Sequence, residues 1–143
     1  MLIESISITN FRQFYGEVSL QFSTDSEKNI TVVHGSNGSG KTSLLNAFKW
    51  CFYGETDFDT LDENILNEAA IQDTKNGGLV EIKIEVRFLD ENKRYCAIRS
   101  QKYKKTMGII ANKTEESVFA LDVTGSDGQT KRSTQPHVEL KAI

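Results

Sequence analysis

Residues 30–53 read ITVVHGSNGSGKTSLLNAFKWCFY, and this stretch decides the fold that we expect for the chain. Residues 30–34 are mostly apolar and β-branched, which predicts a strand buried on both faces in a parallel sheet. A glycine-rich segment follows, and residues 41–53 then carry apolar side chains at helical spacing, with Gly54 placed to end the helix. The expected order is therefore strand, glycine-rich loop and helix.

The glycine-rich segment fits the pattern G-x-x-x-x-G-K-[ST], which binds nucleotide phosphates when a strand precedes it and a helix follows. Glycine lets the backbone wrap a triphosphate closely, and successive N–H groups at the positive end of a helix dipole attract the β-phosphate. Lys41 adds a charge between the β- and γ-phosphates, and the Thr42 hydroxyl is suited to ligate Mg²⁺. A plain glycine-rich turn would need neither of these two side chains. The predicted ATP-binding residues are Gly35, Ser36, Asn37, Gly38, Ser39, Gly40, Lys41 and Thr42.

With 143 residues, 38% of them hydrophobic, the chain has the size of one domain. It contains no apolar run near the roughly 20 residues that a membrane-spanning helix needs, and its N-terminus has no secretion signal. Cys51 and Cys96 fall at core-like positions without metal-ligand spacing, which is typical of reduced thiols. We therefore expect a cytoplasmic protein that has no membrane partner.

Alternation of apolar and polar residues predicts further strands. Residues 2–9 and 18–22 alternate on either side of a short interruption, so we expect them to pair as antiparallel neighbours. Residues 79–89 alternate strictly, which predicts an antiparallel strand with one solvent-exposed face. Less regular strands are expected over 94–103 and 117–124.

Three segments have less decisive patterns. The acidic residues 55–63 are open to two interpretations, a metal site or a solvated loop, and the lack of a histidine or a calcium-loop pattern favours the loop. Residues 65–70 fit either a short helical turn or a strand. Residues 133–143 predict a helix with Pro136 in its first turn and Thr134 as its cap.

Positive charge concentrates in one stretch of a chain whose net charge is −3. This stretch contains Arg99, Lys102, Lys104 and Lys105, with Tyr103 among them. Such a patch is suited to contact DNA phosphates. A solvated strand end or hairpin tip explains the same residues equally well.

Two segments, ISITNFRQFYG at 6–16 and HGSNGSGKTSLLNAFKWCFYGE at 34–55, resemble the opening of the SMC/RecF/SbcC superfamily of DNA-repair and genome-maintenance ATPases. Asn37 matches the superfamily's GxNGxGK[ST] form of the loop. The FxGE-like segment and the FYGE at 52–55, after the helix, are most similar to DndD-type proteins of phosphorothioation-linked defence. The resemblance covers the first 54 residues well, whereas the strands beyond them agree in pattern and carry no diagnostic motif.

The resemblance implies an α/β fold of the P-loop NTPase class, namely the N-terminal lobe of an ABC-type head. This lobe has a mixed sheet, a P-loop helix and an antiparallel β-subdomain. We expect the P-loop region over residues 1–54 and the β-rich subdomain over residues 79–132, as parts of one head.

Two further residues gain a role from the resemblance. Ser43 resembles the residue that helps hold the α-phosphate. Arg12, in the NFR segment, resembles the arginine that reaches bound nucleotide phosphate in related heads. A surface arginine packed beside Phe11 and Phe14 is an equally good interpretation of Arg12.

The superfamily's glutamine loop, signature motif, Walker B strand and switch histidine are not found in residues 1–143. We therefore interpret the chain as the first part of an ATPase head whose C-terminal half is not present, and we assign no catalytic residue. The complete head would hydrolyse ATP, and the isolated chain is expected to be inactive because phosphoryl transfer needs all of these groups together.

The expected function is binding of ATP and Mg²⁺ for an SMC-like ATPase in DNA repair, DNA maintenance or defence against foreign DNA such as that of phages. The resemblance implies four partners: a second head in a homodimer, the C-terminal half of the same head, double-stranded DNA, and a nuclease or defence protein. Three alternatives stay open, namely a transporter's ATP-binding subunit, another P-loop NTPase and a non-hydrolysing regulatory fragment. The sequence has no NKxD motif, which would indicate a GTPase.

Overall fold

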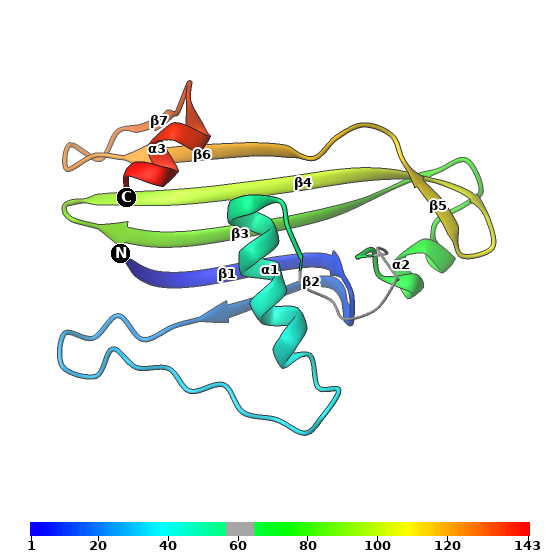
Figure 1. The fold of residues 1–143 in the computed structure, drawn as a ribbon, viewed down its shortest axis with the longest axis horizontal. Coiled ribbons are helices and arrows are strands. Elements are labelled where there is room, and N and C mark those ends of the chain that lie inside the picture. The colour runs from blue at the N-terminus through cyan, green and yellow to red at the C-terminus, as the bar shows by residue number, and fades with distance from the viewer. Residues whose placement is uncertain (57–64) are drawn as a thin grey trace.

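The structure, a computed structural model, describes residues 1–56 and 65–143. Most of the acidic segment 55–63, and with it the choice between a metal site and a solvated loop, lies outside the described residues. In chain order the described elements are β1 (Leu2–Phe11), β2 (Phe14–Gln21), α1 (Lys41–Tyr53), α2 (Glu68–Asp73), β3 (Leu79–Asp90), β4 (Lys93–Met107), β5 (Ile110–Lys113), β6 (Val118–Thr124), β7 (Thr130–Arg132) and α3 (Pro136–Ala142) (Figure 1). None of these described helices is long and apolar enough to cross a membrane.

In the described part of the chain, seven strands form one sheet in the order β2-β1-β3-β4-β6-β7, with β5 paired to β4. The strands predicted over 2–9 and 18–22 pair as antiparallel neighbours, with Ile8 opposite Val18. β3 and β4 form the long central hairpin (Figure 1). The expected α/β fold with an antiparallel β-subdomain is therefore confirmed.

The sheet has one buried face and one face of charged residues. All five apolar residues of the alternating run in β3 are buried, as the alternation predicted. On the opposite face Lys83 pairs with Glu85, and Arg132 of β7 pairs with Asp122 of β6. Because α1 and α3 lie over the buried face (Figure 1), the described chain has two layers, a sheet and a partial cover of helices.

α1 crosses the buried face of the sheet with its N-terminus at the glycine-rich loop (Figure 1). It spans Lys41–Tyr53, as predicted, and ends at Gly54, whose φ of 77° lets its N–H donate to Trp50 O at 2.9 Å. Ala47, Trp50 and Cys51 pack into the core. Cys51 is fully buried, as expected for a core thiol, and burial raises the pKa of its thiol to about 12, which keeps it protonated. Cys96 is only half-buried and lies beside Glu85 on the charged face of the sheet, so the expected core position is wrong for this thiol.

The strand predicted over residues 30–34 is not formed. Ile30, Val32 and Val33 are 81%, 77% and 49% exposed, and all strand pairs of the described sheet are antiparallel. β-Branched residues form a strand only where a neighbouring strand takes their backbone hydrogen bonds and other side chains cover them. No described strand pairs with residues 30–34, so the expected mixed sheet is present only as its antiparallel part.

Smaller differences concern the ends of elements. β5 and β7 are short strands that the sequence pattern did not indicate. Residues 65–70 combine one β-bridge with the first turn of α2, so each of the two interpretations holds in part. α3 begins at Pro136, but its N-cap is Gln135 and not Thr134, because proline at the first helical position fixes the start one residue later.

Arg99 of β4 is a buried cation at the C-terminal end of α1. It is 5% exposed, its Nε donates to Cys51 O at 3.0 Å, and its Nη1 donates to Ser117 Oγ at 3.0 Å. The guanidinium carbon also lies 4.9 Å from the centre of the Phe119 ring. Since the last carbonyls of a helix carry partial negative charge, a cation there stabilises the helix end.

We expect Arg99→Ala to lower the free energy of unfolding by about 1.5–3 kcal/mol, the usual loss for a hydrogen bond to a charged group. Urea unfolding followed by the fluorescence of Trp50, the single tryptophan, measures this change. Lys104→Ala is the control, because Lys104 is exposed on the same strand and should change the value by less than about 0.5 kcal/mol. Equal effects of the two substitutions would show that Arg99 does not support the helix end.

Candidate nucleotide-binding site

The glycine-rich loop folds against the side chain of Lys41. Lys41 Nζ donates to the backbone carbonyls of Gly35 and Ser36 at 2.7 and 2.8 Å. The N–H of Ser39 donates to the same Ser36 carbonyl at 3.2 Å, which turns the loop back on itself. An ammonium group has three N–H donors, so the third is left to meet a phosphate oxygen held by the loop.

The N-terminus of α1 is open to an anion. Its N-cap is Gly40, with a φ of 98°, and within the described chain it has no side-chain cap hydrogen bond and no acidic residue in its first turn. In contrast, Asn67 caps α2 by accepting from the Ala70 N–H at 3.0 Å. The first N–H groups of α1 are therefore left for a ligand, and the helix dipole adds partial positive charge at the same place.

A cavity of about 180 Å³ lies against the loop and the first turn of α1. It is smaller than the roughly 300 Å³ at which pockets for drug-sized ligands begin, so it suits phosphate groups better than a whole nucleotide. The residues that line this phosphate cavity are Gln13, Asn37, Gly38, Gly40, Lys41 and Thr42.

Most of the predicted loop residues meet at the phosphate cavity. Five of them line it, and two more, Gly35 and Ser36, hold the Lys41 side chain. Ser39 packs its hydroxyl against Gly35, where an added Cβ would lie only 2.5 Å from Ser39 Oγ. A side chain at position 35 would therefore displace the Ser39 hydroxyl from this position, and glycine avoids that shift.

Ser43 is placed differently from what the resemblance implies for its side chain. It is 3% exposed, and its hydroxyl donates to Oε1 of Gln13. The hydroxyl is thus already used within the protein, and the backbone N–H of Ser43 is the group that remains at the helix N-terminus. Its contact with an α-phosphate stays a prediction.

The turn between β1 and β2 reaches the phosphate cavity through Gln13. Arg12 has a φ of 51°, its N–H donates to Ile65 O at 2.9 Å, and its carbonyl accepts from Asn67 Nδ2 at 2.6 Å. Arg12 is half-buried and is not among the described residues that line the cavity, so its phosphate contact stays a prediction. Gln13 does line it, although it is not part of the loop motif. Its position directly after NFR, between two predicted strands, is the signal that would have pointed to it.

The basic stretch is divided between the two faces of β4. Arg99 points into the core, and Lys105 is 7% exposed and donates to Gln72 O at 3.0 Å. Lys102 and Lys104 are exposed. Because side chains alternate along a strand, only these two lysines of the stretch remain as candidate DNA contacts.

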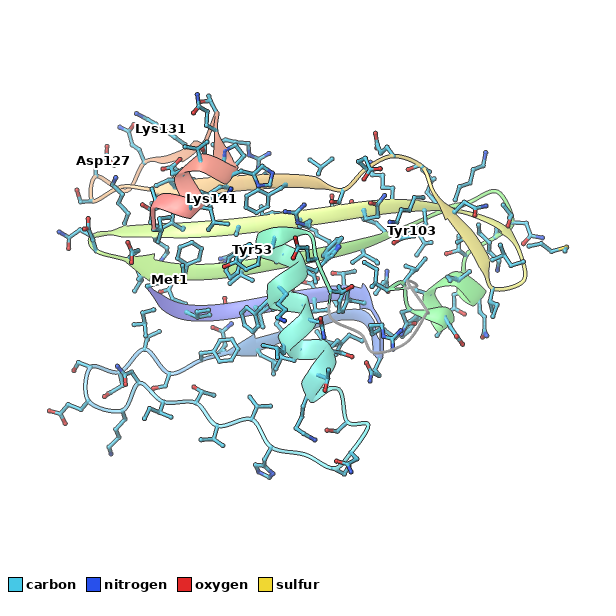
Figure 2. All side chains as sticks on the ribbon, in the orientation of Figure 1. Met1, Tyr53, Tyr103, Asp127, Lys131 and Lys141 are labelled. Atoms are coloured by element: carbon cyan, nitrogen blue, oxygen red, sulfur yellow. The ribbon has the colours of Figure 1, made fainter. Side chains whose placement is uncertain are left out.

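A second cavity, of about 630 Å³, lies at the C-terminal end of α1. Figure 2 labels Met1, Tyr53 and Lys141, which belong to its walls. The residues that line this cavity include none of the predicted phosphate-binding residues, so the prediction of phosphate binding stays with the N-terminal end of α1. The lining residues are Met1, Phe52, Tyr53, Glu55, His137, Leu140, Lys141 and Ile143.

The antiparallel sheet, the helix across it and the loop at the helix N-terminus together give the chain the fold of the N-terminal segment of an SMC-like ATPase head. A solved structure described as "Structural biochemistry of ATP-driven dimerization and DNA stimulated activation of SMC ATPases" matches with a TM-score of 0.55 and 17% identity. The match covers 100% of this chain and 77% of that chain. At this identity the likeness shows the fold alone.

The chain belongs to the AAA domain family, whose model matches residues 5–140. It is similar to the DNA replication and repair protein RecF of Clostridium kluyveri, with 30% identity over 117 residues that cover 77% of this chain and 31% of that protein. It is also similar to the DNA repair protein RAD50 of Drosophila melanogaster, with 26% identity over 148 residues that cover 99% of this chain and 10% of that protein. The chain therefore spans a third or less of the length of these relatives, and its family membership implies a nucleotide-binding segment.

We expect Lys41→Ala to weaken Mg-ATP binding roughly ten- to a hundredfold, because a charge-assisted phosphate contact and the bonds that order the loop are both lost. Isothermal titration calorimetry of the purified chain measures the Kd. Lys28→Ala is the matched control, since Lys28 is an exposed lysine in the segment before the loop and should be dispensable. Equal affinities of Lys41→Ala and the unaltered chain would contradict this assignment of the site.

Proposed function

We propose that the chain binds Mg-ATP as the N-terminal part of one head of a DNA-acting, SMC-like ATPase. The observation that carries the proposal is Lys41 held against the Gly35 and Ser36 carbonyls, beside the uncapped N-terminus of α1. This arrangement brings a point charge, backbone N–H donors and a helix dipole to one place, and a chain of phosphates needs all three. Membership of the AAA domain family supports the proposal.

Magnesium fits this site through Thr42 and the phosphates themselves. Thr42 lines the phosphate cavity beside Lys41, so its hydroxyl is available to a cation that bridges phosphate oxygens. Among the described residues, no three His, Cys, Asp or Glu side chains form a group that would hold a metal. A bound Mg²⁺ would therefore take most of its ligands from phosphate and water, as this ion commonly does, and would offset the phosphate charge.

Hydrolysis requires groups beyond those of the phosphate cavity. Its residues bind and neutralise phosphate, whereas phosphoryl transfer also needs an oriented water molecule and further charge-stabilising partners. We infer that the C-terminal half of the same head and a second head, in a homodimer, supply these groups. The ATP-driven dimerization named for the matching SMC structure supports this arrangement.

We propose double-stranded DNA as the macromolecular partner of the assembled head. RecF and RAD50, to which the chain is similar, are named as DNA repair proteins, which favours repair over genome maintenance or defence as the process. The exposed Lys102 and Lys104 supply positive charge for DNA phosphates. An ATPase that acts on DNA works where DNA and ATP are found, so we place the protein in the cytoplasm. The finer proposal of a DndD-type protein, and with it a nuclease or defence partner, rests on the FxGE-like segment and the FYGE at 52–55.

We expect the isolated chain to bind ATP without multiple turnover, because a held triphosphate without a positioned nucleophile lacks much of the proximity and orientation contribution to catalysis. Phosphate release by the purified chain should equal that of its Lys41→Ala variant. Addition of the C-terminal half of the head should then produce release that depends on Lys41.

Two results would decide whether the chain needs the rest of the head to hydrolyse ATP. Multiple turnover by the chain alone that Lys41→Ala abolishes would show that the chain is not an incomplete head. Release that appears only on mixing would support a site divided between two parts of the head.

We expect the double substitution Lys102→Glu and Lys104→Glu in the assembled protein to weaken duplex binding and to reduce its salt dependence. Each lost phosphate contact should lower the slope of log K against log salt by roughly 0.9, so two contacts lower it by roughly 1.8. Fluorescence anisotropy of a labelled duplex over a range of salt concentrations measures the slope. The control is Lys93→Glu with Lys131→Glu, which gives the same change in net charge. Lys93 begins β4, and Figure 2 shows Lys131 far along the sheet from Tyr103, which lies between Lys102 and Lys104. An unchanged slope in the first pair would assign Lys102 and Lys104 to ordinary solvated surface.

A further inference from the structure

Gln13 occupies the turn between β1 and β2 and lies against two parts of the phosphate site. Its Oε1 accepts a hydrogen bond from Ser43 Oγ, in the first turn of α1. Gln13 is also one of the residues that line the phosphate cavity, together with Lys41 and Thr42. The β1–β2 turn therefore contributes Gln13 to the lining of the cavity, although Gln13 lies 30 residues from Ser43 in the sequence.

The bond from Ser43 determines which end of the Gln13 carboxamide is left for a ligand. A carboxamide has one oxygen that accepts and one NH₂ group that donates two hydrogen bonds. Since the Ser43 hydroxyl takes the oxygen, the NH₂ group is the one that Gln13 can offer to the cavity. Phosphate oxygens only accept hydrogen bonds at neutral pH, so an NH₂ donor matches them and a carbonyl oxygen would not.

The turn that carries Gln13 is fixed before any ligand binds. Arg12, the preceding residue, is bonded through its backbone to Ile65 O and to the Asn67 side chain. Phe14, the following residue, packs on the loop, since a Cβ added at Gly40 would lie 3.4 Å from the Phe14 ring. The Gln13 side chain is itself exposed, but the fixed turn and the bond from Ser43 restrict it, so it loses less conformational freedom when it binds a ligand, which favours binding.

We propose that Gln13 is a phosphate-binding residue of this site, donating from Nε2 to a phosphate oxygen while Ser43 holds its Oε1. The inference rests on the proposed Mg-ATP binding at the loop. It adds to that site a neutral donor that the loop motif does not contain. The competing role is purely structural, in which Gln13 only braces Ser43 and the first turn of α1.

Gln13→Glu separates the two roles. A carboxylate at this position still accepts from Ser43 Oγ–H, so a bracing role survives, but it donates nothing and places negative charge beside the phosphates. Direct phosphate binding therefore predicts that Gln13→Glu raises the Kd for Mg-ATP by about tenfold or more. Gln129→Glu is the control, because it makes the same charge change in the β6–β7 turn, away from the loop (Figure 1), and should bind as the unaltered chain does.

A second comparison uses two variants that add no charge to the site. Gln13→Leu loses both the donor and the acceptor, whereas Ser43→Ala loses only the brace. If Gln13 binds phosphate, Gln13→Leu should weaken Mg-ATP binding several-fold more than Ser43→Ala does, and the difference should persist when Ser43→Ala is the background. If Gln13 only braces Ser43, the two single variants and the double variant should all weaken binding equally.

The measurement is the Kd of the chain for Mg-ATP by calorimetry, with the urea midpoint of each variant recorded to confirm that it folds. Unaltered binding by Gln13→Glu, or equal effects of Gln13→Leu and Ser43→Ala, would overturn the inference while leaving the loop site intact. Binding that does not depend on Lys41 would instead overturn the proposed function, and the role of Gln13 with it. A weakened Gln13→Glu beside a normal Gln129→Glu supports the assignment.

Discussion

The packing of α1 across the antiparallel sheet holds the helix in place. The protein supplies hydrogen-bond partners to its C-terminal end and leaves its N-terminal end without a side-chain cap in the described chain. Ala47, Trp50 and Cys51 anchor it in the core. At the C-terminal end the protein itself satisfies two of the last carbonyls, since the Gly54 N–H donates to Trp50 O and the buried Arg99 donates to Cys51 O. At the N-terminal end nothing among the described side chains caps the helix. The helix dipole is therefore compensated by the protein at one end and left open to an anion at the other, and the proposed phosphate site depends on this difference.

The glycine-rich loop takes its support from the helix and the β1–β2 turn rather than from the segment before it. Residues 30–34 are exposed and pair with no described strand, so they impose little on the loop. Lys41 ties the loop to the start of α1 through two carbonyls, and Phe14 packs against Gly40. The geometry of the site consequently follows from the contacts that Lys41 and Phe14 make with the loop.

The features that the sequence predicted well are those set by local pattern. The limits of α1 follow from helical spacing between the loop and Gly54, and the faces of β3 follow from strict alternation. Sequence patterns gave wrong predictions where pairing or burial depends on a neighbouring element. Residues 30–34 have the composition of a strand without a neighbour in the described chain, and the basic stretch reads as one patch although alternation buries Arg99 and Lys105. The composition of a segment indicates which secondary structure it can form, whereas the burial of each side chain depends on which other elements pack beside it.

The same distinction explains why the motif identifies Lys41 and Thr42 but not Gln13. The loop motif is contiguous, so its residues share a site by covalent connection alone. Gln13 joins them only because β1 and β2 pair with Phe11 opposite Phe14, which leaves Arg12 and Gln13 as the two residues of the turn. Side chains alternate along strands, so a shift of one residue in this register would place a different side chain of the turn against α1. Register therefore places the Gln13 carboxamide against Ser43, while the backbone of Arg12, at a φ of 51°, is bonded toward Ile65 and Asn67.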